Sequence, residues 1–230
     1  MKMRNLLLLG ALLMTSGGMM AQTSLSTAKA KVVPGYQAMD QGAIISFKVP
    51  ATIGGWQMEL TLPEGLSLVE NSAEITVNGE KASGSSFDGV ALSSAHKGHA
   101  LLGGTKSDGT VMLICFPTTT DAALSAQSGE LCSIKVKADA SYTGTQQVQV
   151  KNFIAADPTG SATQYTASAV SFDVIALQGD VTEDGIVNGG DIQGVINAVV
   201  ADSSDEKYDA NRDGQLNGGD IQQVINEIVL

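Results

Sequence analysis

The chain has 230 residues, 24 of them acidic and 13 basic, so its formal net charge is −11 at pH 7. The excess is uneven, because residues 178–230 hold 11 acidic and 2 basic residues, a net of −9. This balance argues against nucleic acid or an anionic membrane as partner, since both require basic surface. The length allows one medium domain and a small one. The acidic C-terminal segment suits a bound cation.

The first 21 residues have the pattern of a secretory signal peptide. A basic start, MKMRN, precedes the apolar run LLLLGALLM, and MMAQ offers a cleavage point after Ala21. The run is too short, and too soon interrupted by glycine, to span a bilayer comfortably. We therefore expect an exported protein, secreted or held in the periplasm or at the cell surface.

Residues 24–176 carry β-strand patterns throughout, and they make up nearly all of the predicted sandwich domain, residues 22–176. In the segment WQMELTL, for example, Trp56, Met58 and Leu60 share one face and polar residues share the other. The segments expected as strands are AIISFKV, WQMELTL, AEITV, VMLICF, LCSIKVKA, QQVQVKNF and SAVSFDV. Turn signals such as Asn78-Gly79 separate them. We predict an antiparallel β-sandwich of jelly-roll type, with a barrel as the weaker alternative.

The two cysteines, Cys115 and Cys132, lie inside strand-like segments. Export would permit a disulfide between them. A buried free thiol is the other interpretation, because it behaves as a small apolar side chain. Sequence spacing does not decide between the two.

Helical periodicity begins after residue 190, within the predicted tail domain 177–230. Two segments, DIQGVINAVV and DIQQVINEIV, place apolar residues at intervals of three and four. The two stripes consist of Ile192, Val195, Ile196 and Val199, and of Ile221, Val224, Ile225 and Ile228. Each stripe is too short to stabilise a helix alone. We expect the two helices to pack against each other.

A segment rich in aspartate and glycine precedes each helix, and the two segments have the same spacing of aspartate, asparagine and glycine residues. They begin at Asp180 and Asp209, and the repeats extend over residues 180–200 and 209–229. A twelve-residue calcium loop has oxygen ligands at positions one, three, five, seven, nine and twelve, and glycine at six. The residues at those ligand positions are Asp180, Thr182, Asp184, Ile186, Asn188 and Asp191, and Asp209, Asn211, Asp213, Gln215, Asn217 and Asp220.

The loops therefore predict two calcium ions, with Ile186 and Gln215 contributing backbone carbonyls and the ninth position acting through water. The sixth position is Gly185 or Gly214. A pair of solvated Asp-Gly turns is the alternative, but two in register before amphipathic helices make it improbable. Because Thr182 is a weaker ligand than Asn211, we expect the first site to be the weaker one.

Residues 179–230 resemble a type I dockerin in these two loop-plus-helix repeats, which lack an entering helix and end their loops in aspartate. The resemblance implies two calcium ions and docking to a cohesin module through one of two near-equivalent helices. It also suggests where a partner would touch: Gly189, Gly190, Asn197, Gly218, Gly219 and Asn226. At these positions well-known dockerins carry hydroxyl or basic residues, so metal binding transfers better than cohesin recognition.

The preceding segment resembles cohesins and related sandwich modules more loosely, including carbohydrate-binding modules. The resemblance lies in MELTLPEGLSLVE, GELCSIKVKADA and VQVKNFIAADPTG, and covers most of residues 30–175. It implies a cohesin-like sandwich and transfers no binding residue.

Catalysis is not expected. No pair of carboxylates has a recognisable catalytic setting, and Glu59 and Glu64 are interpreted as exposed strand and turn charges. His96 and His99 fall in a glycine-flanked segment that we expect to be a solvated loop. No GxSxG motif or phosphate-binding loop is present.

We therefore expect a secreted adaptor that docks through calcium, with a polysaccharide-degrading assembly as a natural setting by resemblance. The alternative is a carbohydrate-binding protein whose tail packs on its own sandwich. Sugar sites use exposed aromatic rings, and the likelier exposed rings are Phe87 and Tyr165. The junction FDVIALQGDVTEDG lacks a flexible linker, so we expect the two parts to pack against each other.

Overall fold

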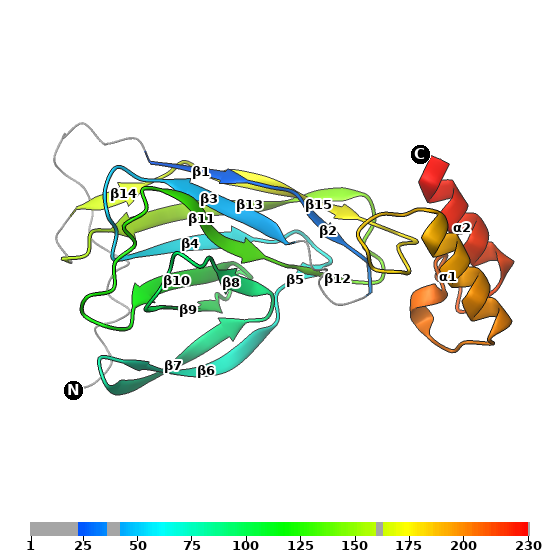
Figure 1. Ribbon diagram of the computed structural model, residues 1–230, viewed down its shortest axis with the longest axis horizontal. Helices are drawn as coiled ribbons and strands as arrows, with labels where there is room; N and C mark the ends of the chain where they lie inside the picture. The colour runs from blue at the N-terminus through cyan, green and yellow to red at the C-terminus, as the bar shows by residue number, and fades with distance from the viewer. Residues whose placement is uncertain (1–22, 36–41, 160–162, 230) are drawn as a thin grey trace.

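The computed structural model describes residues 23–35, 42–159 and 163–229. The signal peptide predicted for residues 1–21 lies outside these ranges. The described part consists of a β-sandwich followed by a small helical tail at one end of it (Figure 1). The predicted fold class, mainly β with two C-terminal helices, is confirmed.

The smaller sheet of the sandwich has four strands in the order β1-β3-β11-β8. Their bounds are β1 Ser24–Thr27, β3 Ala43–Lys48, β11 Ser128–Ile134 and β8 Val90–Leu92. All pairs in this sheet are antiparallel, and β11 shifts register against β3 between Glu130 and Cys132.

The larger sheet has nine strands in the order β2-β15-β13-β4-β10-β9-β7-β6, with β14 paired to β13. Their bounds are β2 Ala30–Val32, β15 Val170–Ala176, β13 Thr145–Ala156, β4 Gly55–Thr61, β10 Val111–Pro117, β9 His99–Thr105, β7 Glu80–Phe87, β6 Glu70–Val77 and β14 Gln164–Thr166. The strand pairs are antiparallel, as predicted, except at one edge, where β2 runs parallel to β15. A separate two-stranded ribbon pairs β5 Leu66–Ser67 with β12 Lys137–Ala138.

The core lies between the two sheets, because alternate residues of each strand point inward. Trp56, Met58 and Leu60 of β4 are buried as predicted, opposite Cys115, Leu113 and Val111 of β10. Cys132 and Ile134 of β11 are buried in the same core. Both cysteines are free thiols, and burial raises the pKa of Cys115 to about 12. The disulfide alternative is therefore not realised.

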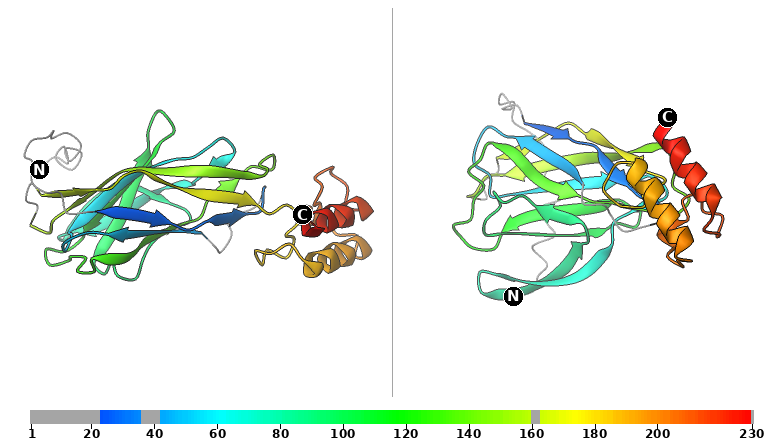
Figure 2. Two further views of the ribbon diagram at one scale, coloured as in Figure 1. Left: turned by 90° about the horizontal axis from the view of Figure 1, so that it is seen from above. Right: turned by 45° about the vertical axis from the view of Figure 1, so that its right-hand side comes forward.

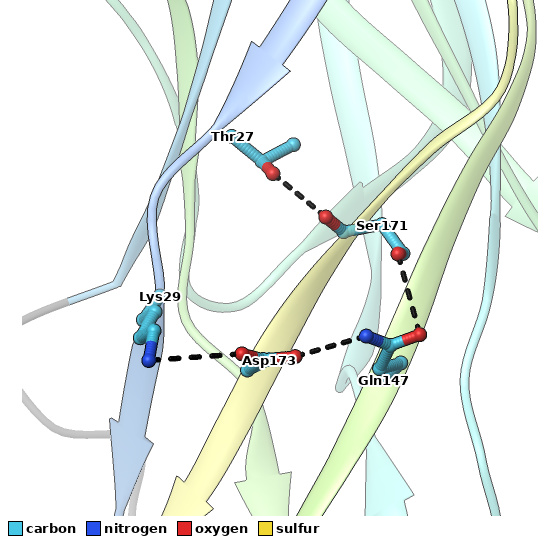
Figure 3. Close-up of polar contacts among 5 residues, drawn as sticks. All are labelled: Thr27, Lys29, Gln147, Ser171 and Asp173. Carbon is cyan, nitrogen blue, oxygen red and sulfur yellow. Dashed lines mark hydrogen bonds and ion pairs between the residues drawn. The ribbon is translucent and has the colours of Figure 1, made fainter.

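The N-terminal strand joins the two sheets. Its first half, β1, pairs with β3 of the small sheet, and its continuation, β2, pairs with β15 of the large sheet. Polar contacts hold this crossover (Figure 3): the Thr27 hydroxyl donates to the Ser171 carbonyl at 2.8 Å, and Lys29 lies 3.8 Å from the Asp173 carboxylate. Gln147 of β13 donates to the same carboxylate at 3.0 Å. This crossover delivers residues 30–35 to the end of the sandwich where the tail begins.

The tail follows β15 after a short connection and contains α1 Gly189–Val200, the 3₁₀ turn η2 Glu206–Tyr208 and α2 Gly218–Val229. The two helices lie side by side (Figure 2). They share a small apolar core centred on Val181, Val195, Ala210 and Val224. Within the described residues, no helix is long and apolar enough to cross a membrane.

The predicted apolar stripes are only partly buried. Val195 and Val224 are fully enclosed, and Ile192, Val199 and Ile221 pack at the edge of the tail core. Ile225 and Ile228, however, are 37% and 41% exposed, because the short helices touch along a face narrower than the stripe. The expectation that the whole stripes bury each other is wrong for these two.

Candidate metal centre and docking helices

Each of the two loops is folded around its first aspartate. Asp180 accepts the backbone N–H of Asp184 at 3.2 Å and that of Gly185 at 2.8 Å. In the second loop Asp209 accepts from Asp213 at 3.2 Å and from Gly214 at 2.8 Å. Glycine is required at the sixth position, because its φ is +85° in the first loop and +82° in the second. The same local structure is thus built twice.

The last aspartate of each loop ties the loop to the helix that follows. Asp191 accepts the backbone N–H groups of Thr182 and Asn188 at 2.9 and 2.8 Å. It forms a capping box with Asn188, the N-cap of α1, whose side chain accepts from Gly190 at 2.7 Å. This explains why each helix begins where its loop ends.

The second loop repeats this closure. Asp220 accepts the backbone N–H of Asn211 at 3.1 Å and that of Asn217 at 2.8 Å, while the Asn217 side chain accepts from Gly219 at 2.7 Å. The third position differs between the loops. The Thr182 hydroxyl donates to Asp191 at 2.8 Å, whereas the Asn211 side chain donates to Asp213 at 3.2 Å.

The remaining predicted ligand groups lie within the same turns. The Ile186 carbonyl accepts from the Asn188 side chain at 3.1 Å, and the Gln215 carbonyl accepts from Asn217 at 3.0 Å. Asp184 accepts the N–H of Ile186, and Asp213 accepts that of Gln215. The oxygen-bearing groups at all six predicted positions of each loop therefore belong to one compact segment.

Three of these carboxylates, Asp180, Asp191 and Asp220, have no exposed surface. Their hydrogen-bond donors are backbone N–H groups and, for Asp191, the Thr182 hydroxyl. Burial raises the pKa of Asp180, and the neighbouring charges of Asp191 and Asp184 act in the same direction. Carboxylate, amide and carbonyl oxygens form the donor set of a hard cation such as calcium. The residues present therefore fit calcium.

Across the described residues, no three His, Cys, Asp or Glu side chains converge as a metal cluster. In each loop the carboxylates are turned toward backbone N–H groups of their own turn. Calcium loops draw much of their ligand set from amide, hydroxyl and carbonyl oxygens, so the fit rests on the mixed oxygen set.

The six residues expected to touch a partner lie at matching places on the two helices. Gly189, Gly190 and Gly218 are exposed in the first turns, and Gly219 is half-buried. Asn197 and Asn226 are exposed, and each accepts a 2.9 Å hydrogen bond from the glutamine one turn earlier, Gln193 or Gln222. Both helices therefore present the same pair of amide side chains to solvent.

The tail touches the sandwich through its loops. The ammonium of Lys31 in β2 donates to the Gly185 carbonyl at 2.8 Å, and the guanidinium of Arg212 donates to the Pro34 carbonyl. The Leu177 N–H donates to the Val32 carbonyl at 2.8 Å. The contacts agree with the packing expected from the short junction, and they leave the Gln–Asn pairs of α1 and α2 exposed.

Two candidates in the sandwich were assigned the wrong environment. Glu59 is buried, where Lys106 forms an ion pair with it and Asn152 donates to it at 2.9 Å; Glu64 is exposed as expected. His96 is also buried, and both ring nitrogens have partners: Trp56 Nε1 donates to its Nε2 at 3.0 Å, and the Ser93 hydroxyl contacts its Nδ1. Burial lowers the pKa of His96 to about 4. His96 packs beside the core residue Trp56, whereas Glu59 lies on the outer face of β4, covered by Lys106 and Asn152.

The exposed rings expected of a sugar site are not found among the described residues. Phe87 has 5% of its surface exposed and joins the core, and Tyr165 is half-buried against it. Phe87 is the last residue of β7, where it turns inward beside Gly103 of β9. The interpretation of Phe87 as an exposed ring was therefore wrong.

Several solved structures resemble the sandwich. A non-cellulosomal cohesin from Archaeoglobus fulgidus is 11% identical, with 68% of this chain and 93% of that chain covered and a TM-score of 0.44. A chain of the type I cohesin–dockerin complex Coh-OlpA-Doc918 from Clostridium thermocellum is 12% identical, with 67% of this chain and 99% of that chain covered and a TM-score of 0.47. The cohesin module of a Clostridium perfringens family 33 glycoside hydrolase is 7% identical, with 68% of this chain and 96% of that chain covered and a TM-score of 0.46. Among curated proteins, none matches the chain.

A family model, described as the dockerin type I domain, matches residues 178–229. The match covers both loops and both helices, and it confirms the resemblance that the repeated segment suggested. Dockerin and cohesin-like domains are non-catalytic modules. Residues 178–229 thus match the dockerin type I domain, and they follow directly on a β-sandwich.

Proposed function

We propose that the tail binds two calcium ions, one in each loop. The ligands would be Asp180, Thr182, Asp184, the Ile186 carbonyl, Asn188 and Asp191 in the first loop, and Asp209, Asn211, Asp213, the Gln215 carbonyl, Asn217 and Asp220 in the second. The observation that carries this proposal is the recurrence, in both loops, of the same hydrogen bonds around buried or half-buried carboxylates. Bound calcium would neutralise the negative charge of these carboxylates, whose hydrogen-bond donors here are mainly backbone N–H groups.

We further propose that the calcium-loaded tail docks a cohesin-like module and that the chain is a non-catalytic adaptor. The domains would be the sandwich, residues 22–176, and the tail, residues 177–230. Support comes from the dockerin match and from the exposed helix surfaces, which the sandwich does not cover. Dockerin and cohesin modules usually belong to extracellular assemblies, which agrees with the signal peptide proposed for residues 1–21.

The docking surface proposed on the helices is polar and uncharged at its centre. It consists of the first-turn glycines and the exposed amides of Asn197 and Asn226. Because recognition by amides and small residues depends on hydrogen bonds and close approach, we expect the partner surface to lack a dense charge cluster.

The test is a calcium-dependent capture experiment. The chain from residue 22 to 230 is immobilised, secreted and envelope proteins of the source organism are passed over it, and bound protein is eluted with a chelator. Elution of a sandwich module that is retained only in calcium is the expected result. Calorimetric titration of the same chain should give two calcium ions per molecule. Two bound ions with no protein released by chelator would reject docking while retaining calcium binding.

A further inference from the structure

Residues 30–35 form the structural link between the sandwich and both loops of the tail. The N-terminal strand crosses between sheets just before them, and Thr27 and Lys29 fasten this crossover to β15 (Figure 3). β2 then pairs with the end of β15, from which the tail departs. Beyond β2, the Gly35 N–H donates to the Ala138 carbonyl at 2.8 Å. The segment is therefore held by the sandwich on one side.

Its other side receives one contact from each loop of the tail. Lys31 donates to the carbonyl of Gly185, which is the sixth position of the first loop. Pro34 accepts from the guanidinium of Arg212, which is the fourth position of the second loop. Neither position is among the predicted calcium ligands. The contacts can therefore form alongside a bound ion.

The local structure at Gly35 agrees with a tight fit. Gly35 has φ +84°, and an added Cβ there would lie 2.6 Å from the Arg212 guanidinium. The fourth position of the first loop is Glu183, which has the same left-handed conformation as Arg212, with φ values of +61° and +59°. Among the two near-identical loops, only the second thus carries a cation at this place. The difference distinguishes the two loops in their contact with the sandwich.

Both contacts require folded loops. The direction of the Gly185 carbonyl depends on the backbone of Gly185, which has φ +85°. Arg212 itself has a left-handed backbone conformation and lies between two predicted ligands, Asn211 and Asp213. These conformations are held by turns around Asp180 and Asp209. When no cation neutralises the clustered carboxylates, their mutual repulsion opposes those turns. Loop folding and contact with residues 30–35 are therefore coupled.

We propose that residues 30–35 are a calcium-dependent latch, which fixes the tail to the sandwich when the two loops are loaded. The proposal rests on the calcium binding proposed above. Loading would position the Gly185 carbonyl for Lys31 and the Arg212 guanidinium for Pro34 together. The helices would then project from a rigid end of the molecule, while their exposed amide pairs stay accessible. Removal of calcium would release the tail.

Hydrogen–deuterium exchange of the chain from residue 22 to 230 tests the latch, with and without calcium. We expect calcium to slow exchange in residues 30–35 and 177–179 by about tenfold or more. The double variant Lys31→Gln, Arg212→Asn should lose most of this protection. Asparagine is chosen because it tolerates the left-handed conformation. The matched control is Lys48→Gln, Glu183→Asn, which removes an exposed lysine and the corresponding loop residue.

Calorimetry on the same proteins separates this proposal from the preceding one. Two calcium ions bound by the double variant, with protection of residues 30–35 lost, would support the latch. Two ions bound by the unaltered chain, with exchange in residues 30–35 unchanged by calcium, would overturn the latch alone. Equal protection in the double variant and its control would also overturn it. A flat calcium titration would overturn both proposals.

Discussion

At the scale of single residues, the tail is distinguished by aspartate carboxylates in its interior. Asp180, Asp191 and Asp220 have no exposed surface, and backbone N–H groups donate to each of them. Such hydrogen bonds orient a carboxylate but leave its negative charge in place. A carboxylate buried near others raises the free energy of the folded state unless a cation compensates. Calcium should therefore stabilise the tail, and removal of any one of these carboxylates should reduce that stabilisation.

Substitution of the first aspartate of a loop should remove one ion. We expect Asp180→Asn and Asp209→Asn each to lower the stoichiometry from two to one and to reduce the melting temperature in calcium. A chain of this size loses about 2–4 °C per kcal/mol of lost stabilisation. In chelator, Asp180→Asn should melt no lower than the unaltered chain, because it removes a repelling charge. Calorimetry and thermal melts measure both quantities.

Asp202→Asn is the matched control for these variants. Asp202 lies after α1, outside both loops, is exposed and has φ +50°, which asparagine tolerates. Its substitution should leave the stoichiometry and the calcium-dependent melting shift unchanged. Retention of two ions by Asp180→Asn would contradict the assignment of the first ligand.

His96 gives the sandwich its own pH dependence. Trp56 Nε1 donates to Nε2 of His96, which requires this nitrogen to be unprotonated, and burial lowers the pKa of His96 from 6.5 to about 4. Between these two values the unfolded chain binds the proton and the folded chain does not, so stability falls as the pH falls. The contribution lost between pH 7 and pH 5 is about 2 kcal/mol. Denaturant unfolding followed by Trp56 fluorescence measures it.

His96→Gln separates this effect from other titrations. Glutamine offers an acceptor to Trp56 and a donor to Ser93, so the variant should fold, but it cannot be protonated. We expect its stability to change less between pH 7 and pH 5 than that of the unaltered chain, by about 2 kcal/mol. Parallel pH profiles for the two proteins would show that His96 is not protonated preferentially in the unfolded state.

At the scale of elements, the pairing of β9 with β10 depends on the absence of a side chain at Gly103. An added Cβ there would lie 1.8 Å from the Met112 carbonyl, whereas one at the adjacent Gly104 would meet only Glu70 Oε1, at 3.9 Å. We expect Gly103→Ala to destabilise the sandwich by at least about 2 kcal/mol. Gly104→Ala should stay within about 0.5 kcal/mol. Denaturant midpoints compare them, and equal midpoints would contradict the close approach.

The strands that alternation marks clearly were predicted correctly, while β1, β2, β5, β7, β8, β9 and β14 were not among the segments expected as strands; β7 and β9 are the longest of these. β7 has the sequence EKASGSSF, and β9 contains Gly103 and Gly104. Neither segment has the β-branched residues or the alternation by which a strand is predicted from sequence. Their extended form comes from pairing with β6 and β10. The loops and helices of the tail were predicted well, because their spacing encodes purely local hydrogen bonds. Their contacts with Lys31 and Pro34 join residues far apart in sequence, which no local pattern indicates.

The wrongly assigned side chains have the same cause. Glu59 alternates onto the outer face of β4, as expected for a polar residue, but Lys106 and Asn152 cover it there. His96 lies in a glycine-flanked turn, yet its ring fills space beside Trp56. Alternation predicted correctly that Glu59 lies on the outer face of β4, but polarity placed His96 in solvent, where its ring does not lie. Neither pattern predicted that other parts of the chain would cover these side chains.

At the scale of the whole molecule, the tail lies beyond one end of the sandwich with both helices accessible (Figures 1 and 2). The fixed contacts involve the loops, while Gln193 and Asn197 on α1 and Gln222 and Asn226 on α2 remain in solvent. The repeat that builds the two loops thus also builds two equivalent surfaces on one tail. A partner bound at either helix would be held in a different orientation relative to the sandwich.

This equivalence predicts how docking responds to substitution. Asn197→Arg and Asn226→Arg each place a long charged side chain at an exposed position of a helix, where arginine preserves helical propensity. If either helix can dock, a single substitution removes one of two binding modes and weakens affinity by about twofold, about 0.4 kcal/mol. The double variant should weaken it more than about tenfold. The measurement is titration of the captured partner with each variant in calcium, alongside the calcium stoichiometry, which should remain two. Abolition of binding by one single variant alone would show that the two helices are not equivalent and that the sandwich dictates which one the partner meets.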